Sequence, residues 1–248
     1  MVTTLLTTHH VGGRAGTRTF PSMKYFEKDL VNVLYEADES SISGIKKETH
    51  YLPSKTIILP DCLSGSAGKR KFYIYNNRYF SSLYPLKPEQ TGAYSFDSQF
   101  GWDTDPKALS IVETLTLDTV TLDEVVKREK SENIPSPDFL SLDTQGSELE
   151  ILKGGEFAIR NTVVAIATEV SFTQIYQGQP LFGEITDYLN EIGFHLASLE
   201  IFNTESSSHR SPVGLRGKGF IQSGEALFLR KLSNYDTINE KITSQLKQ

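Results

Sequence analysis

Two acidic residues follow apolar strand patterns and could take part in proton transfer. Asp143 comes directly after the apolar run Phe139–Leu142 and precedes a turn and a helical segment, 147–153. Glu169 stands at the end of the next apolar run, Val163–Thr168. In a parallel sheet the carboxyl ends of successive strands form one functional edge, so the two carboxylates are predicted to share it. A carboxylate there can act as a general base.

A glycine-rich turn near the N-terminus and an acid further along predict a nucleoside site. The turn is Val11-Gly12-Gly13-Arg14-Ala15-Gly16, and glycine lets the backbone approach a ligand closely. Glu36 stands twenty residues beyond Gly16, at the end of a second apolar strand. An acid at this spacing suits the two hydroxyls of a ribose. The spacing does not separate a dinucleotide from S-adenosylmethionine.

Metal and disulfide chemistry have little support in the sequence. Cys62 is the single cysteine of the chain, which excludes an intramolecular disulfide and a cysteine-based metal site. The five histidines show no i, i+4 pair of the kind that binds zinc from one helix. We therefore predict no metal ligands. No phosphate-binding P-loop and no nucleophile elbow occur.

Short β-branched strands that alternate with amphipathic helices must position these residues. The remaining predicted strands are 31–35, 56–59, 71–75, 196–202 and 226–230. Helical spacing appears in 122–130 and 182–192 as well as in 147–153, which the pair Gly154-Gly155 is expected to end. The alternation predicts a mostly parallel α/β sheet, and the last two strands are expected to pair as an antiparallel hairpin at its edge.

Length, charge and hydropathy narrow the class of protein. The chain has 248 residues, 38% of them hydrophobic, which allows one large domain with a sizeable core. Its net charge of −6 argues against general binding to nucleic acid or anionic membranes. The sequence shows neither an apolar run long enough to span a membrane nor a secretory signal. A cytoplasmic location is the expectation.

The motifs of the chain, in order, resemble the FkbM family of S-adenosylmethionine-dependent methyltransferases. The most specific stretch is Asp143-Thr-Gln-Gly146-Ser-Glu-Leu-Glu-Ile-Leu-Lys-Gly154. It is accompanied by Ser81-Ser82-Leu83 and by the segment from Glu169 to Phe172. The resemblance implies a Rossmann-like class I methyltransferase fold with seven strands, the last one antiparallel, and helices on both faces.

The resemblance also implies where a cofactor would be held. Gly12, Gly13 and Gly16, with Arg14 in the same turn, would face the methionine part of S-adenosylmethionine, and Glu36 would hold its ribose. Asp61, Cys62 and Leu63 would border the adenine, and Asp143 and Gln145 would lie below the sulfonium and the acceptor. Such methyltransferases usually carry an acid two residues before the first glycine; this chain has His10 there.

The family is regarded as O-methylating hydroxyl groups of sugars, glycans or natural products, so a small-molecule or glycan acceptor is expected. Asp143 is the first candidate for the base, Glu169 the second, and His209 a third. One methyltransferase domain is expected over 1–233, with a hairpin and aromatic insertion at about 65–115, followed by a helical tail at 234–248. The short N-terminus suggests a homo-oligomer or a partner subunit that completes the domain.

Two other functions remain open at this point. His10 in place of the usual acid favours a binding module that has kept the fold and lost the cofactor. The glycine turn with Glu36 also fits a dinucleotide oxidoreductase, although that function leaves the Asp143 and Glu169 segments unexplained.

Overall fold

The protein is described here from a computed structural model that covers residues 6–12, 28–50, 55–87, 94–98, 109–129, 134–207 and 220–231. Within these residues, eight strands form one large sheet in the order β3-β2-β1-β8-β9-β11-β10-β6. In sequence order these strands are β1 (Leu6–Val11), β2 (Leu30–Tyr35), β3 (Lys55–Leu59), β6 (Tyr94–Ser98), β8 (Phe139–Leu142), β9 (Ala165–Ser171), β10 (Phe194–Ser207) and β11 (Phe220–Arg230).

The direction of the strands confirms the predicted fold class. The five strands from β3 to β9 pair in parallel, and β11 runs antiparallel to both of its neighbours, β9 and β10. Apart from β6, the seven strands from β3 to β10 in this order form a mostly parallel sheet whose last strand in sequence, β11, is antiparallel. The β10–β11 hairpin was predicted correctly, but its position at the sheet edge was wrong, because β6 pairs antiparallel with β10 beyond it.

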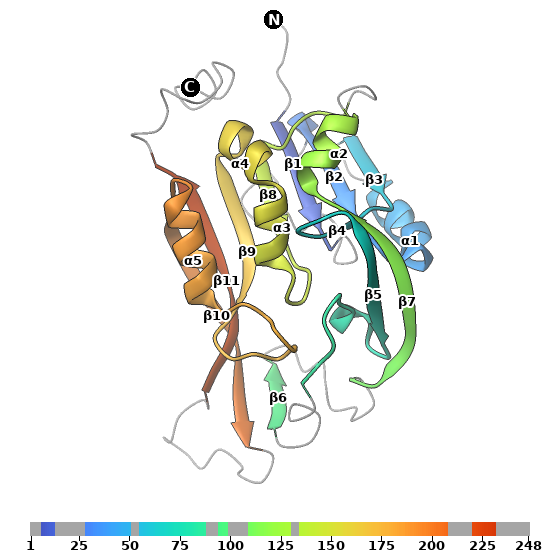
Figure 1. The fold of residues 1–248 in the computed structure, drawn as a ribbon, viewed down its shortest axis with the longest axis vertical. Coiled ribbons are helices and arrows are strands. Elements are labelled where there is room, and N and C mark those ends of the chain that lie inside the picture. Colours follow the sequence, from blue (N-terminus) through green and yellow to red (C-terminus); the bar gives the residue numbers. More distant parts are fainter. Residues whose placement is uncertain are drawn as a thin grey trace, which may run out of the picture.

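Helices α2 (Leu122–Glu129), α3 (Glu148–Gly154), α4 (Glu156–Thr162) and α5 (Phe182–Glu191) cover one face of this sheet (Figure 1). Their apolar side chains pack with those of the central strands into one core cluster, which includes Leu140, Ile151, Ile166 and Phe228. These residues are at most 1% exposed. Burying the apolar stripe of each helix against the sheet is the main source of stability in such layered folds.

A second, smaller sheet accounts for most of the described part of the predicted insertion. Strands β4 (Cys62–Leu63), β7 (Ile111–Val120) and β5 (Gly68–Tyr75) form it in the order β4-β7-β5. Figure 1 shows the long β5 and β7 side by side, projecting away from the large sheet. The hairpin runs to Val120, past the boundary expected near 115, and β6 inside the insertion joins the large sheet instead.

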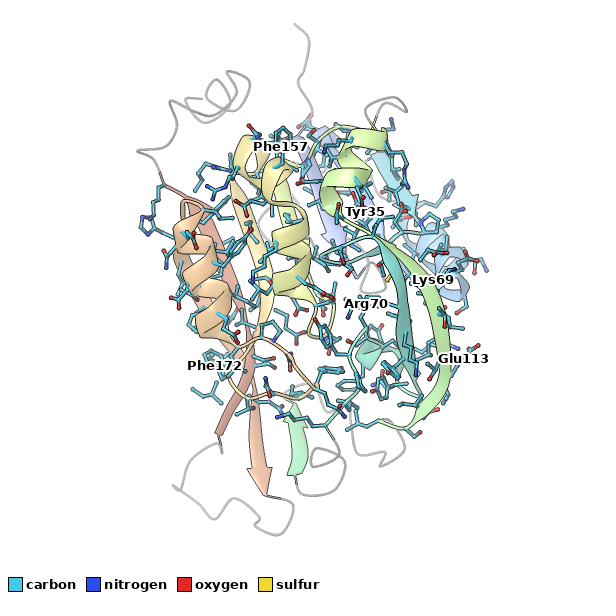
Figure 2. The ribbon with its side chains drawn as sticks, in the orientation of Figure 1. Tyr35, Lys69, Arg70, Glu113, Phe157 and Phe172 are labelled. Carbon is cyan, nitrogen blue, oxygen red and sulfur yellow. The ribbon has the colours of Figure 1, made fainter. Side chains whose placement is uncertain are left out.

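An ion pair fastens the small sheet to α3. Nη1 of Arg70, on β5, donates to both carboxylate oxygens of Glu150 at 2.7 and 2.8 Å and to Oγ of Ser64 at 3.0 Å. Figure 2 labels Arg70 between the small sheet and α3, and Lys69 next to it on the opposite side of β5. The small sheet is therefore held against the element that follows the Asp143 turn.

The pair Gly154-Gly155 ends α3 as predicted, but close packing explains the glycines better than capping does. Neither residue has a positive φ, and α4 begins directly after Gly155. A Cβ at Gly154 would lie 2.7 Å from the carbonyl oxygen of Ser64, and one at Gly155 would lie 2.7 Å from the side chain of Leu122. The glycines thus let α3 and α4 approach the neighbouring elements.

The prediction for β9 needs a correction in its bounds. The apolar run predicted a strand at 163–168, whereas Val163 ends α4 and the strand spans Ala165–Ser171. Glu169 therefore lies inside the strand rather than at its end. Two helices were missed, α4 and α1 (Glu39–Thr49), because neither has a sustained apolar stripe. The predicted tail at 234–248 lies outside the described residues.

Candidate cofactor and catalytic site

The large sheet has its topological switch point between β1 and β8. The main chain after β1 packs closely against the main chain after β8 there. Gly12, just after β1, has a φ of +93°, and a Cβ on it would lie 1.9 Å from the main-chain oxygen of Asp143. The N–H of Gly12 donates to Tyr35 and the N–H of Asp143 donates to Val11. Glycine is therefore required at position 12 by both conformation and space.

A pocket opens at this point, on the carboxyl side of the parallel strands, where open α/β sheets bind ligands. Its empty space is about 660 Å³, including the open mouth. The ends of four strands of the large sheet contribute Gly12, Glu36, Asp61 and Asp143 to its walls. The pocket thus extends from Glu36, just after β2, to Asp143, just after β8.

The first end of the pocket is built around Glu36. Its side chain is buried, at 6% exposure for the residue, and Oε1 accepts the main-chain N–H of Asp38 at 2.8 Å. Asp38 caps the N-terminus of α1 and also forms an ion pair of 2.6 Å with Arg78, which the small-sheet region supplies. Arg78 lines the same pocket. The insertion therefore forms one wall beside Glu36.

The residues predicted to border an adenine lie where β3 ends. Asp61 is held by Arg128 of α2 through two hydrogen bonds of 3.2 and 2.7 Å, which fix the orientation of its carboxylate. Cys62 and Leu63 are buried in β4 and line the pocket beside it. Burial raises the pKa of the Cys62 thiol to about 12, so the thiol stays neutral and acts as a wall.

The turn after β8 directs Asp143 into the pocket. The buried carboxylate of Glu148 accepts the N–H groups of Thr144, at 2.9 Å, and of Gly146, at 3.0 Å, and so ties the turn to the start of α3. Gln145 adopts a φ of +58° within this turn, a left-handed conformation that is uncommon outside glycine. Asp143 is left exposed at the pocket wall.

Gln145 connects the two predicted catalytic acids. Its Nε2 donates to Oδ1 of Asp143 at 2.9 Å and to Oε2 of Glu169 at 2.7 Å. Burial, reinforced by the nearby charge of Asp143, raises the pKa of Glu169 well above its usual value. The two acids therefore share one amide donor, with Asp143 at the pocket and Glu169 behind it, outside the lining residues.

His10 is near this site but faces away from the cavity. Its ring is 2% exposed, with Nε2 3.2 Å from the carbonyl oxygen of Gly12 and Nδ1 2.9 Å from Oγ of Ser141. A carbonyl only accepts, so Nε2 carries the proton and Nδ1 accepts from the Ser141 hydroxyl. Burial lowers the pKa of His10, against the opposing influence of Asp143, and the ring is neutral at pH 7.

The structure brings most of the predicted site residues to one pocket: Gly12, Glu36, Asp61, Cys62, Leu63, Asp143 and Gln145 line it. His10 and Glu169 adjoin the site without lining the pocket. Gly13, Arg14, Gly16 and His209 lie outside the described residues. Among the described aromatic side chains from Tyr79 to Tyr84, Phe80 and Tyr84 pack against core clusters, and Tyr79 lines the pocket at 47% exposure.

Sequence reasoning missed the wall that the insertion provides. Phe72, Arg78, Tyr79, Ser81 and Leu83 line the pocket from the small sheet and its following loop. The strict alternation of polar and apolar residues from Thr114 to Asp118 was a readable strand signal for β7. It would have predicted the hairpin but not its position over the site, which depends on long-range packing.

Two further findings concern the described residues as a whole. No three His, Cys, Asp or Glu side chains among them are grouped so as to hold a metal ion. None of the helices in this part of the chain is long and apolar enough to cross a membrane.

The strand order, the antiparallel last strand and a pocket at the switch point define a Rossmann-like α/β fold of the class I methyltransferase type. The sequence agrees, because the profile described as "Methyltransferase FkbM domain" matches residues 10–196. The chain belongs to the FkbM methyltransferase family, as its motifs predicted. No curated relative matches it in sequence.

Two solved structures match the chain at low sequence identity. A structure titled methyltransferase FkbM from Methylobacillus flagellatus KT is 13% identical, with a TM-score of 0.48, over 91% of this chain and 43% of that one. The chain thus spans less than half the length of that protein. A precorrin-6y C5,15-methyltransferase from Geobacter metallireducens GS-15 is 9% identical, with a TM-score of 0.41, over 91% and 82% of the two chains.

Proposed function

We propose that the protein is an S-adenosylmethionine-dependent O-methyltransferase that acts on a hydroxyl group of a sugar, a glycan or a natural product. The observation that carries this proposal is the pocket that runs from the buried carboxylate of Glu36 to the exposed carboxylate of Asp143. A nucleoside with a cationic tail matches such a pocket, because its hydroxyls and its positive charge both suit carboxylates.

The residues of the pocket fit this cofactor. Gly12 lines the pocket where β1 ends, in close contact with the main chain of Asp143, and Glu36 provides a buried acceptor at the end of the neighbouring strand. Cys62 and Leu63 add an uncharged surface of the kind that a flat base packs against. Asp61 stands beside them with its carboxylate oriented by Arg128, ready to accept from an amino group.

S-Adenosylmethionine, when bound, would supply a methyl group on a positively charged sulfur: the acceptor oxygen would bond to the methyl carbon in line as the carbon–sulfur bond breaks, and S-adenosylhomocysteine would leave as a neutral thioether. The part left to the chain is to orient the acceptor and to take up its hydroxyl proton. Asp143 is suited to the second task because it is exposed at the pocket wall.

Glu169 is less suited to be the first proton acceptor. It lies behind Gln145, and burial raises its pKa well above the usual value, which favours the neutral form and makes it a weaker base than an exposed carboxylate. In the proposed reaction Asp143 accepts the proton and Glu169 remains its neutral partner. Hydrogen bonding between the acids and the amide of Gln145 keeps Asp143 in place.

The acceptor class rests on family membership and on one feature of the pocket. Tyr79 presents an aromatic face at the pocket and is 47% exposed. Aromatic faces pack well against the apolar faces of sugar rings. This supports a sugar-like or natural-product hydroxyl without selecting among them.

Isothermal titration calorimetry with S-adenosylmethionine and its demethylated product, S-adenosylhomocysteine, tests the cofactor. We expect binding in the micromolar range for both. Glu36→Gln should weaken both about tenfold to hundredfold, since it removes a charged acceptor from the ribose. Asp118→Asn is the matched control, because Asp118 is exposed on β7 at 79% of its side chain. Absence of binding to wild-type protein would refute the proposal.

The alternative of a module that has lost its cofactor can be tested in the same way. It predicts no binding by wild-type protein and a large gain on His10→Asp. We expect the opposite, because the neutral His10 ring is tied to Ser141 and Gly12 and does not repel an ammonium group. His10→Asp should weaken binding or leave it unchanged.

A further inference from the structure

Both the nitrogen and the oxygen of the Gln145 side-chain amide have hydrogen-bond partners. Its two Nε2 hydrogens go to Asp143, at 2.9 Å, and to Glu169, at 2.7 Å. Its Oε1 lies 3.1 Å from the hydroxyl of Tyr176. The reversed amide would direct Oε1 at two carboxyl groups and Nε2 at Tyr176, which is unfavourable whenever one acid is ionised.

Tyr176 can only donate in this arrangement. Its single hydroxyl hydrogen is shared between two acceptors, the carbonyl oxygen of Phe80 at 2.9 Å and Oε1 of Gln145 at 3.1 Å. The residue is 1% exposed and belongs to a core cluster with Tyr75 and Leu86. The ring is thus fixed by packing, and the hydroxyl marks a fixed point to which the amide of Gln145 is tied.

The insertion holds the same turn from another side. Oγ of Ser82 donates to the main-chain oxygen of Gln145 at 2.7 Å, and Phe80 lies two residues earlier in the same loop. Tyr176 comes from the loop that follows β9. Three segments far apart in the sequence therefore converge on one residue with a left-handed backbone, which would otherwise be strained.

We propose that Tyr176 is a positioning residue for the methyl-transfer site: by holding Oε1 of Gln145, it keeps Nε2 between Asp143 and Glu169. No role was assigned to Tyr176 from the sequence. The geometry of the network stands by itself, and its link to catalysis rests on the proposed function.

The position of the Gln145 amide affects the protonation of the neighbouring acid Glu169. A hydrogen bond from Nε2 favours the ionised form of each carboxyl, and it opposes the burial that raises the pKa of Glu169. The other charged groups around Glu169 are Glu148 of α3 and Glu225, its cross-strand neighbour on β11. His10, beside Asp143, is neutral. If the amide of Gln145 is removed, Glu169 loses a hydrogen-bond donor, while the carboxyl groups of Asp143, Glu148 and Glu225 remain close to it.

Carboxyl-carbon NMR of ¹³C-labelled protein, titrated with acid and base, tests this directly and needs no acceptor. Asp143→Asn and Glu169→Gln assign the signals. Tyr176→Phe removes the hydroxyl that holds Oε1 of Gln145, so Nε2 is held less firmly against Glu169. We expect the titration midpoint of Glu169 to rise by up to about one pH unit, the size expected if the hydrogen bond from Nε2 were lost altogether. Gln145→Leu should raise it at least as much.

Two comparisons separate positioning from a general structural effect. Tyr75→Phe is the matched control: Tyr75 lies in the same buried cluster, but its hydroxyl accepts the N–H of Leu86 instead, so the midpoint should not move. In a Gln145→Leu background, Tyr176→Phe should add no further shift, because its effect passes through the amide. An equal shift in that background, or none in the wild-type background, overturns the proposal.

A measurement on wild-type protein keeps the test valid if Tyr176→Phe does not fold. The signals of both side-chain amide protons of Gln145 should shift with the titration of Glu169, and these protons should exchange slowly. Amide signals that are insensitive to pH contradict the proposal. Calorimetry with S-adenosylmethionine is run in parallel. If the wild-type protein titrates as expected but binds no cofactor, the proposed function is refuted, whereas the hydrogen-bond network of Tyr176 and Gln145 is not.

Discussion

Gly12→Ala is the sharpest test of how the site is built. Gly12 has a φ of +93°, and an added Cβ would lie 1.9 Å from the main-chain oxygen of Asp143, where real Cβ atoms stay beyond 3.0 Å. The Asp143 turn must therefore move by about 1.1 Å, the difference of those two distances. Because the contact is with backbone, no side-chain rotation can relieve it.

The expected cost follows from three contributions. A residue other than glycine in this left-handed region costs about 1–2 kcal/mol. Moving the turn weakens two main-chain hydrogen bonds, Gly12 to Tyr35 and Asp143 to Val11, each worth about 1 kcal/mol. We therefore expect the free energy of unfolding to fall by about 3–4 kcal/mol, and the melting temperature by about 6–16 °C for a chain of this size.

Urea denaturation and calorimetry with S-adenosylhomocysteine measure the two consequences. The variant should lose stability and should also lose most of its cofactor affinity, because Gly12 and Asp143 both line the pocket. Gly44→Ala is the control: Gly44 is exposed in α1, a Cβ there meets nothing within 4 Å, and alanine should stabilise the helix by about 0.5–1 kcal/mol. A Gly12→Ala protein of wild-type stability would refute the reasoning.

Two other predictions concern ion pairing and pH. Arg70→Met should lower the free energy of unfolding by about 1–3 kcal/mol in urea, because its pair with Glu150 is mostly shielded, with side-chain exposures of 29% and 23%. Lys69→Met, on the exposed side of β5, should change stability by less than about 0.5 kcal/mol; equal effects would contradict the assignment. Burial lowers the pKa of His9 to about 4, so below pH 6.5 the unfolded chain binds a proton that the folded chain does not. Stability should therefore fall between pH 6.5 and 4, by up to about 3 kcal/mol, and His9→Gln should remove this part of the pH dependence.

Much of the large sheet could be read from local patterns. The runs at Phe139–Leu142 and 31–35 were placed to within one residue, because they are apolar, β-branched or aromatic, and bounded by turn residues. The failures have local causes as well. At Val163 the apolar run continues across the end of α4 into β9, so hydrophobicity did not mark the boundary. Strand β6 is short and pairs only with a residue range more than a hundred positions away.

The composition of the site was predicted better than its internal roles. Order along the chain placed Gly12, Glu36 and Asp143 at strand ends, and strand ends of a parallel sheet meet at one edge. Sequence reasoning could not show that His10 turns away to Ser141, or that Glu169 lies behind Gln145. Those facts depend on side-chain rotamers and on hydrogen-bond partners from other elements.

The sequence by itself determined the class of the fold and the family, and it placed Gly12, Glu36 and Asp143 after strands that meet at one edge, because strand periodicity and motif order are local properties of the chain. Only the tertiary structure decided which acid faces the pocket, which wall the insertion supplies, and how Tyr176 and Ser82 hold Gln145. The physical reason is that these contacts join segments 31 to 96 residues apart. No local pattern specifies them; they form only when the packed core brings the segments together.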